Sequence, residues 1–114
     1  MTDLPQPKED IMIMHPKKRI EILVEAPAFE RVAERLSAAN TMGYSVLPVI
    51  TGRGRGGTWS SDGQVADAGK MVAIICIVDE ARLDEVVSSI FAVLSRQIGI
   101  VSVSDVADIR GERF

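Results

Sequence analysis

Two segments of this 114-residue chain show the same succession of apolar patterns. Each succession predicts a strand, then a helix, then a second strand. In the first copy, residues 19–25 alternate apolar and polar side chains, which predicts a strand with one buried face. Pro27 suits the first turn of a helix, because its missing N–H would have no partner there. Apolar residues then recur at helical spacing: Phe29, Val32, Ala33 and Leu36. Gly43 is predicted to end this helix, and residues 44–50 are predicted to form the second strand.

The second copy begins at residues 71–78, which are apolar throughout and predict a central strand covered on both faces. Asp79 is predicted to cap the helix that follows. The apolar stripe of that helix consists of Leu83, Val86, Val87, Ile90 and Leu94. The last strand is predicted from about residue 98 to residue 109.

This double pattern predicts an α+β fold of the ferredoxin-like type, a βαββαβ sandwich. Its first and third strands are central, and its second and fourth strands lie at the edges. Pro48 agrees with that order, because a proline cannot donate to a sheet ladder and belongs on an edge strand. Two exposed edges favour pairing between subunits, so we expect an oligomer. Residues 51–69, which join the halves, lack periodicity and are predicted to be a structureless loop.

Composition excludes several classes of protein. The net charge of −3 and the pI of about 5.1 disfavour nucleic acid as a partner. One cysteine, Cys76, and one histidine exclude an internal disulfide and a standard structural zinc site. No apolar run approaches the roughly 18–20 residues that cross a bilayer. Residues 1–16, with three prolines and mixed charge but no signal-peptide order, are predicted to be a flexible leader. Residues 17–114 are then one cytoplasmic domain, with Cys76 an inert core residue.

The outstanding local motif is Gly52-Arg53-Gly54-Arg55, directly after the second strand. Glycines let backbone N–H groups converge on an anion, and arginine side chains pair with phosphate oxygens. The motif therefore predicts either a phosphate site or a flexible hairpin connection kept soluble by its arginines. It is not a Walker loop, because the Gly-Lys-Ser/Thr ending is missing. An RNA-binding Arg-Gly segment conflicts with the acidic chain.

Three residues of the same loop, Gly57, Thr58 and Trp59, are candidates for contact with a partner, since tryptophan is a common interface anchor. The alternative is that Trp59 folds back over its own domain. Arg110 and Arg113 are either a second set of phosphate contacts or part of a solvated tail. No spacing of Ser, His, Asp or Glu suggests catalysis, so we predict no catalytic residues and no enzyme.

In the order of these segments the chain resembles the PII superfamily of signalling proteins, from about residue 18 to residue 112. The resemblance rests on a long loop between the two halves and on three sequence segments. These are Lys18-Arg19-Ile20-Glu21-Ile22-Leu23, then Gly43-Tyr44-Ser45-Val46 leading to Gly52-Arg53-Gly54-Arg55, then Gly99-Ile100-Val101-Ser102-Val103.

The resemblance implies a homotrimer that binds adenine nucleotides in the clefts between subunits. Its long loop, called the T-loop, would report the bound ligand to a partner protein. By resemblance, Ser45 would contact the base or ribose side of the nucleotide. The phosphates would lie against Gly52, Arg53, Gly54 and Arg55. The shorter loop of Gln97, Ile98 and Gly99 would close the site, contributed by the adjacent subunit.

Departures from the pattern place the chain nearer one branch of the superfamily. The T-loop carries no tyrosine, and the loop before the last strand is short, Ser95-Arg96-Gln97-Ile98-Gly99. Both features resemble the PII-like branch linked to bicarbonate uptake and carboxysomes, whose members bind AMP, ADP or related nucleotides. The implied function is a non-enzymatic regulator in carbon or nitrogen assimilation, binding ADP, AMP or ATP with or without bicarbonate, and needing no cofactor or metal. The alternative is a ferredoxin-like trimer that binds divalent metal ions.

Overall fold

The computed structural model of the chain describes residues 13–39, 41, 43–54, 57–60, 70–96 and 99–109. The strands are β1 (His15–Glu25), β2 (Ser45–Pro48), β3 (Thr51–Gly54), β4 (Gly57–Ser60), β5 (Met71–Val78) and β6 (Gly99–Asp108). The helices are α2 (Phe29–Ala38) and α3 (Leu83–Leu94), each preceded by a 3-10 turn, η1 (Ala26–Ala28) and η3 (Glu80–Arg82).

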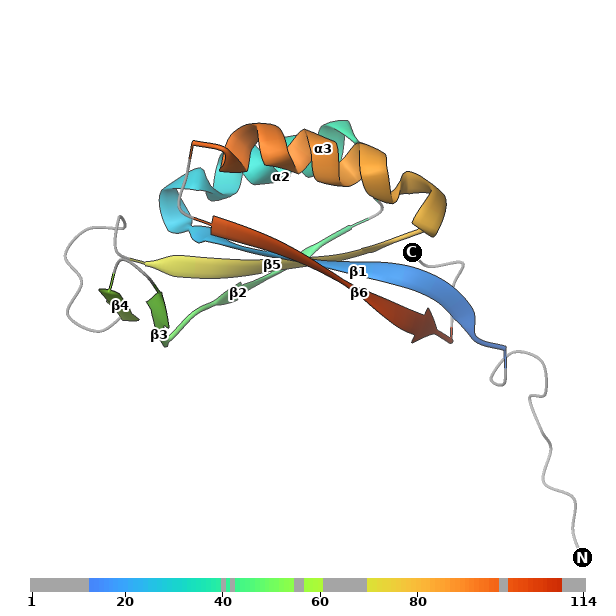
Figure 1. The fold of residues 1–114 in the computed structure, drawn as a ribbon, viewed down its shortest axis with the longest axis horizontal. Coiled ribbons are helices and arrows are strands. Elements are labelled where there is room, and N and C mark those ends of the chain that lie inside the picture. Colours follow the sequence, from blue (N-terminus) through green and yellow to red (C-terminus); the bar gives the residue numbers. More distant parts are fainter. Residues whose placement is uncertain are drawn as a thin grey trace, which may run out of the picture.

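Four strands form one antiparallel sheet in the order β2-β5-β1-β6. Both helices cover the same face of this sheet, and β3 and β4 form a separate hairpin beyond one end of it (Figure 1). The predicted ferredoxin-like α+β fold is thereby confirmed, with β1 and β5 central and β2 and β6 at the edges. Pro48 does lie on an edge strand, opposite Val72 of β5.

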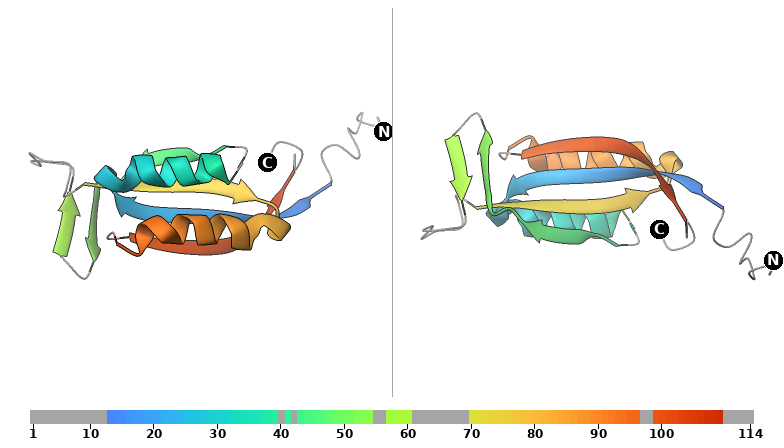
Figure 2. Two further views of the ribbon diagram at one scale, coloured as in Figure 1. Left: turned by 90° about the horizontal axis from the view of Figure 1, so that it is seen from above. Right: turned by 90° about the horizontal axis from the view of Figure 1, so that it is seen from below.

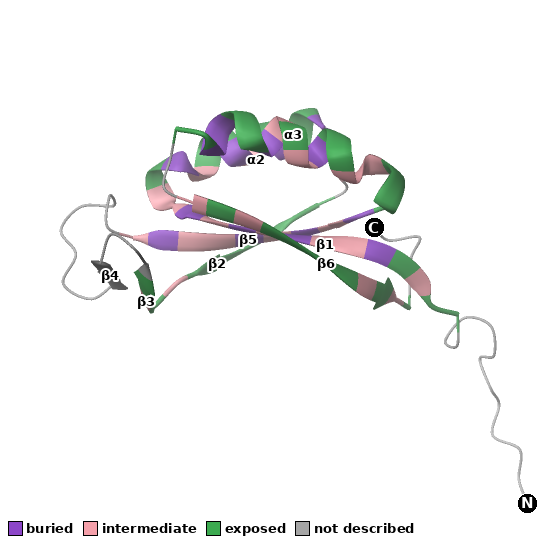
Figure 3. Cartoon of the chain, in the orientation of Figure 1, coloured by how far each residue is buried: buried purple, intermediate pink, exposed green. Residues whose placement is uncertain are grey.

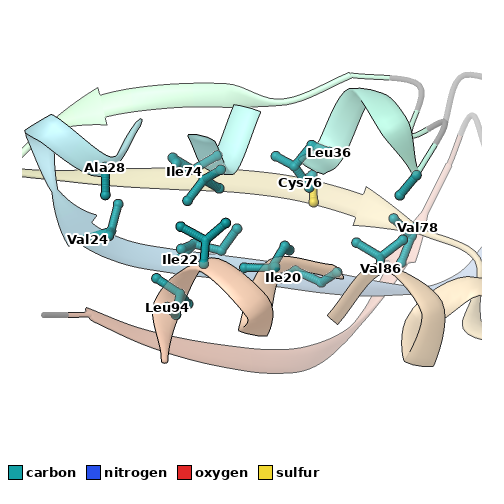
Figure 4. Close-up of a cluster of buried hydrophobic side chains, with 14 residues drawn as sticks. Ile20, Ile22, Val24, Ala28, Leu36, Ile74, Cys76, Val78, Val86 and Leu94 are labelled. Carbon is teal, nitrogen blue, oxygen red and sulfur yellow. The ribbon is translucent and has the colours of Figure 1, made fainter. Parts of the chain in front are cut away.

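The core lies between the sheet and the two helices (Figure 4). The alternating residues of β1 all point into it, and the helical stripes of α2 and α3 pack against them. The fully buried large side chains are Ile20, Ile22, Val24, Val32, Leu36, Ile74, Val86 and Ile90. Each such burial contributes roughly 1.5–3 kcal/mol, so this layer holds the helices on the sheet.

Helix α2 ends at Ala38, five residues before Gly43, so the prediction that Gly43 stops it was wrong. The end is made instead by Thr41, whose backbone N–H donates to the carbonyl of Leu36 at 3.2 Å and whose Oγ1 donates to the same oxygen at 2.9 Å. A Cβ at Gly43 would meet nothing within 4 Å. The helix therefore ends where Thr41 satisfies the carbonyl of Leu36 through both its backbone and its side chain.

Asp79 occupies the predicted N-cap position, before η3, but its side chain makes no capping hydrogen bond. Its carboxylate instead accepts a hydrogen bond from Lys17 across the sheet. The cap prediction was thus wrong about the role of the side chain, because an ion pair with β1 holds it away from the helix.

Strand β1 starts earlier than the alternation indicated. His15 and Pro16, which the sequence analysis placed in the leader, pair with Asp108 and Ala107 of β6. The strand extends because β6, with 10 residues against 11 in β1, supplies partners to its end. The rest of the predicted leader, residues 1–12, lies outside the described residues.

No described helix or strand covers the face of the sheet opposite the helices, called here the open face (Figure 2, right). Alternation and strand register assign to it Arg19, Glu21, Leu23, Ser45, Leu47, Ala73, Ile75, Ile77, Ile100, Ser102 and Ser104. The residues of β5 on this face are only half-buried, coloured pink in Figure 3. The prediction that β5 is covered on both faces was therefore wrong for the single chain, because helices cover only one side.

Cys76 faces the helices and is 2% exposed, as an inert core cysteine should be. Burial raises the pKa of its thiol from 9.0 to about 11. A raised pKa means that the folded state favours the neutral thiol more than the unfolded state does. This contribution to stability is complete below pH 9 and is lost as the pH rises from 9 to 11.

We therefore expect the free energy of unfolding to fall by about 2 to 3 kcal/mol more in the wild type than in Cys76→Ala between pH 9 and 11. Urea unfolding at each pH measures this difference. The Cys76→Ala variant is the control for lysine and tyrosine titration, which both proteins share. Parallel pH profiles for the two proteins would show that the thiol does not titrate differently on unfolding.

Candidate functional site

The Gly-Arg motif lies in a β-hairpin that leaves the main sheet where β2 ends. Strands β3 and β4 pair antiparallel, with Gly52 opposite Trp59, Arg53 opposite Thr58, and Gly54 opposite Gly57. The prediction of a structureless loop was thus wrong for these residues. The hairpin has no apolar periodicity because its strands pair through the backbone, which requires no apolar side chains.

Arg53 is exposed, and it is the arginine of the motif that the structure describes. Gly52 beside it is partly exposed. The backbone of Gly57, Thr58 and Trp59 forms β4, so the predicted partner-contact residues lie directly across the ladder from the predicted phosphate-contact residues. Arg55 lies outside the described residues.

Gly99 is the first residue of β6 and pairs with Val24 of β1. A Cβ at this position would lie 2.8 Å from the carbonyl oxygen of Leu23 and 3.1 Å from a methyl carbon of Leu94. Glycine is therefore required here by the close approach of β1 and α3. This packing role is one that the resemblance did not imply.

The hairpin and Gly99 lie at the same end of the sheet but at opposite edges. Pro48 pairs with Val72, and Met71 pairs with Glu25, next to the Val24–Gly99 pair. Strands β5 and β1 separate β2 from β6, which amounts to about 14 Å at the usual strand spacing. Within one chain, the hairpin and Gly99 therefore lie at the same end of the sheet but are not next to each other.

Lys70 lies at this same end, immediately before β5, and sequence reasoning overlooked it. The residue is partly buried, and its carbonyl accepts a hydrogen bond from the backbone of Ala26 at 3.0 Å. The sequence could have indicated it, because this lysine directly precedes an entirely apolar strand. Lys70 adds a second cation to the end of the sheet that carries Arg53.

Ser45 begins β2 opposite Ile75 and is exposed on the open face. It stands three residues before Pro48, and so toward the middle of the sheet rather than at the hairpin. The other predicted contacts, Gln97, Ile98, Arg110 and Arg113, lie outside the described residues. Strand β6 itself ends at Asp108, which pairs with His15 at the end of the sheet remote from the hairpin.

Several other charged side chains of the described chain pair with one another. Lys18 donates to Asp105, and this hydrogen bond raises the pKa of the Lys18 ammonium group. Arg19 contacts Glu21 at 3.0 Å, and Arg82 contacts Glu85 at 3.2 Å. Arg82 also donates to the carbonyl of Ala39 and thereby joins the two helical segments.

Among the described residues, no group of three or more His, Cys, Asp and Glu side chains is arranged to hold a metal ion. None of the helices in the described ranges is long and apolar enough to cross a membrane.

The architecture defines a class: small ferredoxin-like α+β proteins that carry a long connection between the second and third strands of the main sheet. The chain belongs to the nitrogen regulatory protein P-II family, whose sequence model matches residues 17–113. No curated protein sequence matches it.

Solved structures of PII-like proteins share the fold. The chain is similar to CPII, a nitrogen regulatory PII-like protein from Thiomonas intermedia K12 bound to ADP, AMP and bicarbonate. The identity is 22%, the TM-score is 0.81, and the match covers 90% of this chain and 97% of CPII. A PII-like signalling protein from Thermus thermophilus matches with 23% identity and a TM-score of 0.75, over 90% of this chain and 99% of that one. These matches agree with the PII-like branch indicated by the sequence.

Proposed function

We propose that this protein is a trimeric, non-enzymatic regulator that binds ADP or AMP at the clefts between its subunits, together with bicarbonate. ATP competes for the same site. The ligand orders the hairpin-bearing T-loop, which then contacts a cytoplasmic partner protein in carbon or nitrogen assimilation.

The observation that carries this proposal is the position of the hairpin relative to Gly99. Both lie at one end of the sheet, yet about 14 Å of sheet separates them within a chain. A second subunit that sets its own Gly99 end beside this hairpin closes the distance. A nucleotide site built from Gly52, Arg53 and Gly54 of one subunit and the Gly99 segment of the next is therefore a site between subunits.

The open face supports assembly. Ala73, Ile75 and Ile77 of β5 are half-buried in the single chain although no helix covers them. An uncovered apolar strip of this kind marks an interaction surface. Covering it with copies of the same sheet gives a closed trimer, the arrangement that the family resemblance implies.

The ligand class rests on the comparison with CPII and on the chemistry of the hairpin. CPII binds ADP, AMP and bicarbonate, and this chain shares its fold. Arg53 and neighbouring backbone N–H groups suit phosphate oxygens, and Lys70 adds positive charge at the same end. A planar oxyanion such as bicarbonate suits the same kind of cationic and N–H donors.

The switch follows from differential binding. A ligand shifts a loop only by the difference between its affinities for the two loop states. Charge-assisted hydrogen bonds contribute roughly 1.5–3 kcal/mol each, so two arginine–phosphate contacts supply about 3–6 kcal/mol. That is the size of preference needed to move a loop from mostly open to mostly ordered.

Calorimetric titration with AMP, ADP and ATP, each with and without bicarbonate, tests the function. We expect saturable binding of one nucleotide per subunit, at least about tenfold tighter with bicarbonate, which corresponds to a coupling of about 1.4 kcal/mol. An assay of phosphate release in the same samples should show no turnover. Thermal stabilisation by divalent metal ions alone, with no response to any nucleotide, would contradict the proposal and favour the metal-binding alternative.

A further inference from the structure

Helix α3 is apolar over more of its surface than packing on one face of a sheet requires. Its charged residues, Asp84 and Glu85, are confined to the first turn, whereas the charges of α2 continue from its first turn to its last. Phe91 of α3 is 62% exposed, and it is the one large hydrophobic residue exposed on the described helices. A helix that is apolar on its outer side as well as its inner side usually packs against a further element.

Four exposed residues on the outer side of α3 form what is called here the outer strip. They are Asp84, Ser88, Phe91 and Ser95, the last being the C-cap. At 3.6 residues per turn this spacing places them on one side of the helix. Arg96, also exposed, follows the strip directly. The strip therefore begins with an acid, has a large ring and a small residue around its middle, and ends next to a base.

We propose that the outer strip pairs with the outer strip of a second copy of this chain, antiparallel and about a two-fold axis. Phe91 of each copy then lies against Ser88 of the other, because both positions are equally far from the middle of the strip. For the same reason Asp84 lies beside Ser95 of the other copy, within reach of its Arg96. A two-fold contact uses the same surface of both copies, so this surface must be self-complementary.

Charge complementarity identifies the second copy as the occupant and sets its direction. Among the described residues Asp84 and Arg96 make no ion pair, whereas Glu85 contacts Arg82 at 3.2 Å. Antiparallel pairing brings opposite charges together at both ends of the strip, and parallel pairing would bring like charges together. Exposed ion pairs contribute little affinity, so the charges determine the orientation and the burial of Phe91 supplies the attraction.

The outer strip lies on the helical side of the domain, and the open face lies on the other side of the sheet (Figure 1). A contact through the strip can therefore join two molecules without displacing subunits that meet through the open face. The inference goes beyond the proposed function and does not depend on a nucleotide site.

Sedimentation velocity over a range of concentrations measures this contact. We expect the wild type to associate reversibly into species larger than the one present at the lowest concentration. Phe91→Ser should raise the dissociation constant of this step at least about 30-fold, because two symmetry-related rings lose their burial. The matched control, Arg31→Ser, changes an exposed residue of α2 and should associate as the wild type does.

Charge exchange tests the role of the two ends of the strip. Asp84→Arg should weaken the association at least about threefold, since the new charge faces Arg96 of the other copy. Asp84→Arg/Arg96→Glu restores opposite charges and should associate within about twofold of the wild type.

Cysteine cross-linking tests the orientation, in a Cys76→Ala background that removes the native thiol. A protein with Asp84→Cys is mixed with a protein with Ser95→Cys and treated with oxidised glutathione. Antiparallel pairing predicts a disulfide between the two proteins. Either protein alone should stay uncross-linked, because equal positions of the two helices lie about 16 Å apart, too far for a disulfide.

Circular dichroism identifies any variant that does not fold, and cross-linking carries the test if Phe91→Ser is one of them. A wild type that does not associate at any concentration, unchanged association of Phe91→Ser, or disulfides formed only between equal positions would each overturn the inference. The last two results would assign the outer strip to a different partner. None of these measurements requires a nucleotide, so a failure of the proposed ADP site would not alter their outcome.

Discussion

Replacing Arg53 and Arg55 together by alanine is expected to weaken ADP binding by a factor of about 10² to 10⁴. The estimate follows from the loss of two charge-assisted contacts to phosphate, each contributing roughly 1.5–3 kcal/mol. Arg53 is exposed on β3, and the sequence places Arg55 two residues further along the same motif. Arg53 lies outside the buried core, so the fold should survive its replacement. Calorimetric titration with ADP measures the loss.

Two control variants make this result specific. Arg31→Ala removes an exposed arginine from α2, and so changes the charge without touching the hairpin. We expect it to bind ADP as the wild type does. Arg53→Lys keeps the charge but loses the planar fork, and it should fall between wild type and alanine. Equal ADP affinity in the wild type and the double alanine variant would rule out the hairpin as the phosphate site.

Gly99→Ala is expected to destabilise the protein by about 1–3 kcal/mol, the usual cost of inserting a methyl group into filled space. The new Cβ would lie 2.8 Å from the backbone oxygen of Leu23, which cannot move without shifting β1. The start of β6 must shift instead, and it carries part of the candidate site with it. Urea unfolding measures the loss of stability.

Gly43→Ala is the matched control, because a Cβ at that position meets nothing within 4 Å. We expect its stability to equal or slightly exceed that of the wild type, since alanine restricts the unfolded chain. A Gly99→Ala protein of unchanged stability but reduced ADP affinity would show that Gly99 serves only as a ligand contact. That result would contradict its packing role between β1 and α3.

Periodicity in the sequence was sufficient to predict the core and the order of the strands. Alternation at Ile20, Ile22 and Val24 and the helical stripes define surfaces that must meet, and Pro48 restricts β2 to an edge. The same reasoning could not tell that the helices leave the second face of β5 open. A continuous apolar strand looks identical whether its own helices or another subunit cover it, so periodicity alone counts Ile77 as internal core.

The parts of the fold that prediction missed depend on local polar contacts rather than on apolar patterns. The Thr41 side chain ends α2, and Lys17 draws the Asp79 carboxylate away from its helix. The β3–β4 hairpin is held by backbone pairing. None of these interactions leaves a periodic trace in the sequence.

For the candidate site, the order and the ends of the strands explain the positions of more residues than the sequence motifs do. The position of a strand end fixes where Gly52, Arg53 and Gly99 lie, and these residues were predicted. Lys70 was overlooked because it belongs to no motif and gains its place only from the start of β5. Ser45 was predicted from resemblance, and the sheet places it opposite Ile75, away from the hairpin.

The hairpin is hydrogen bonded within itself and belongs to no ladder of the four-stranded sheet. Arg53 and Thr58 are directly paired in it, so a molecule that binds one strand and moves it also moves the other. Under the proposed function, the residues that contact the ligand and those that contact the partner therefore lie on paired strands of one hairpin. The signal would then be the orientation of this hairpin relative to the rest of the domain.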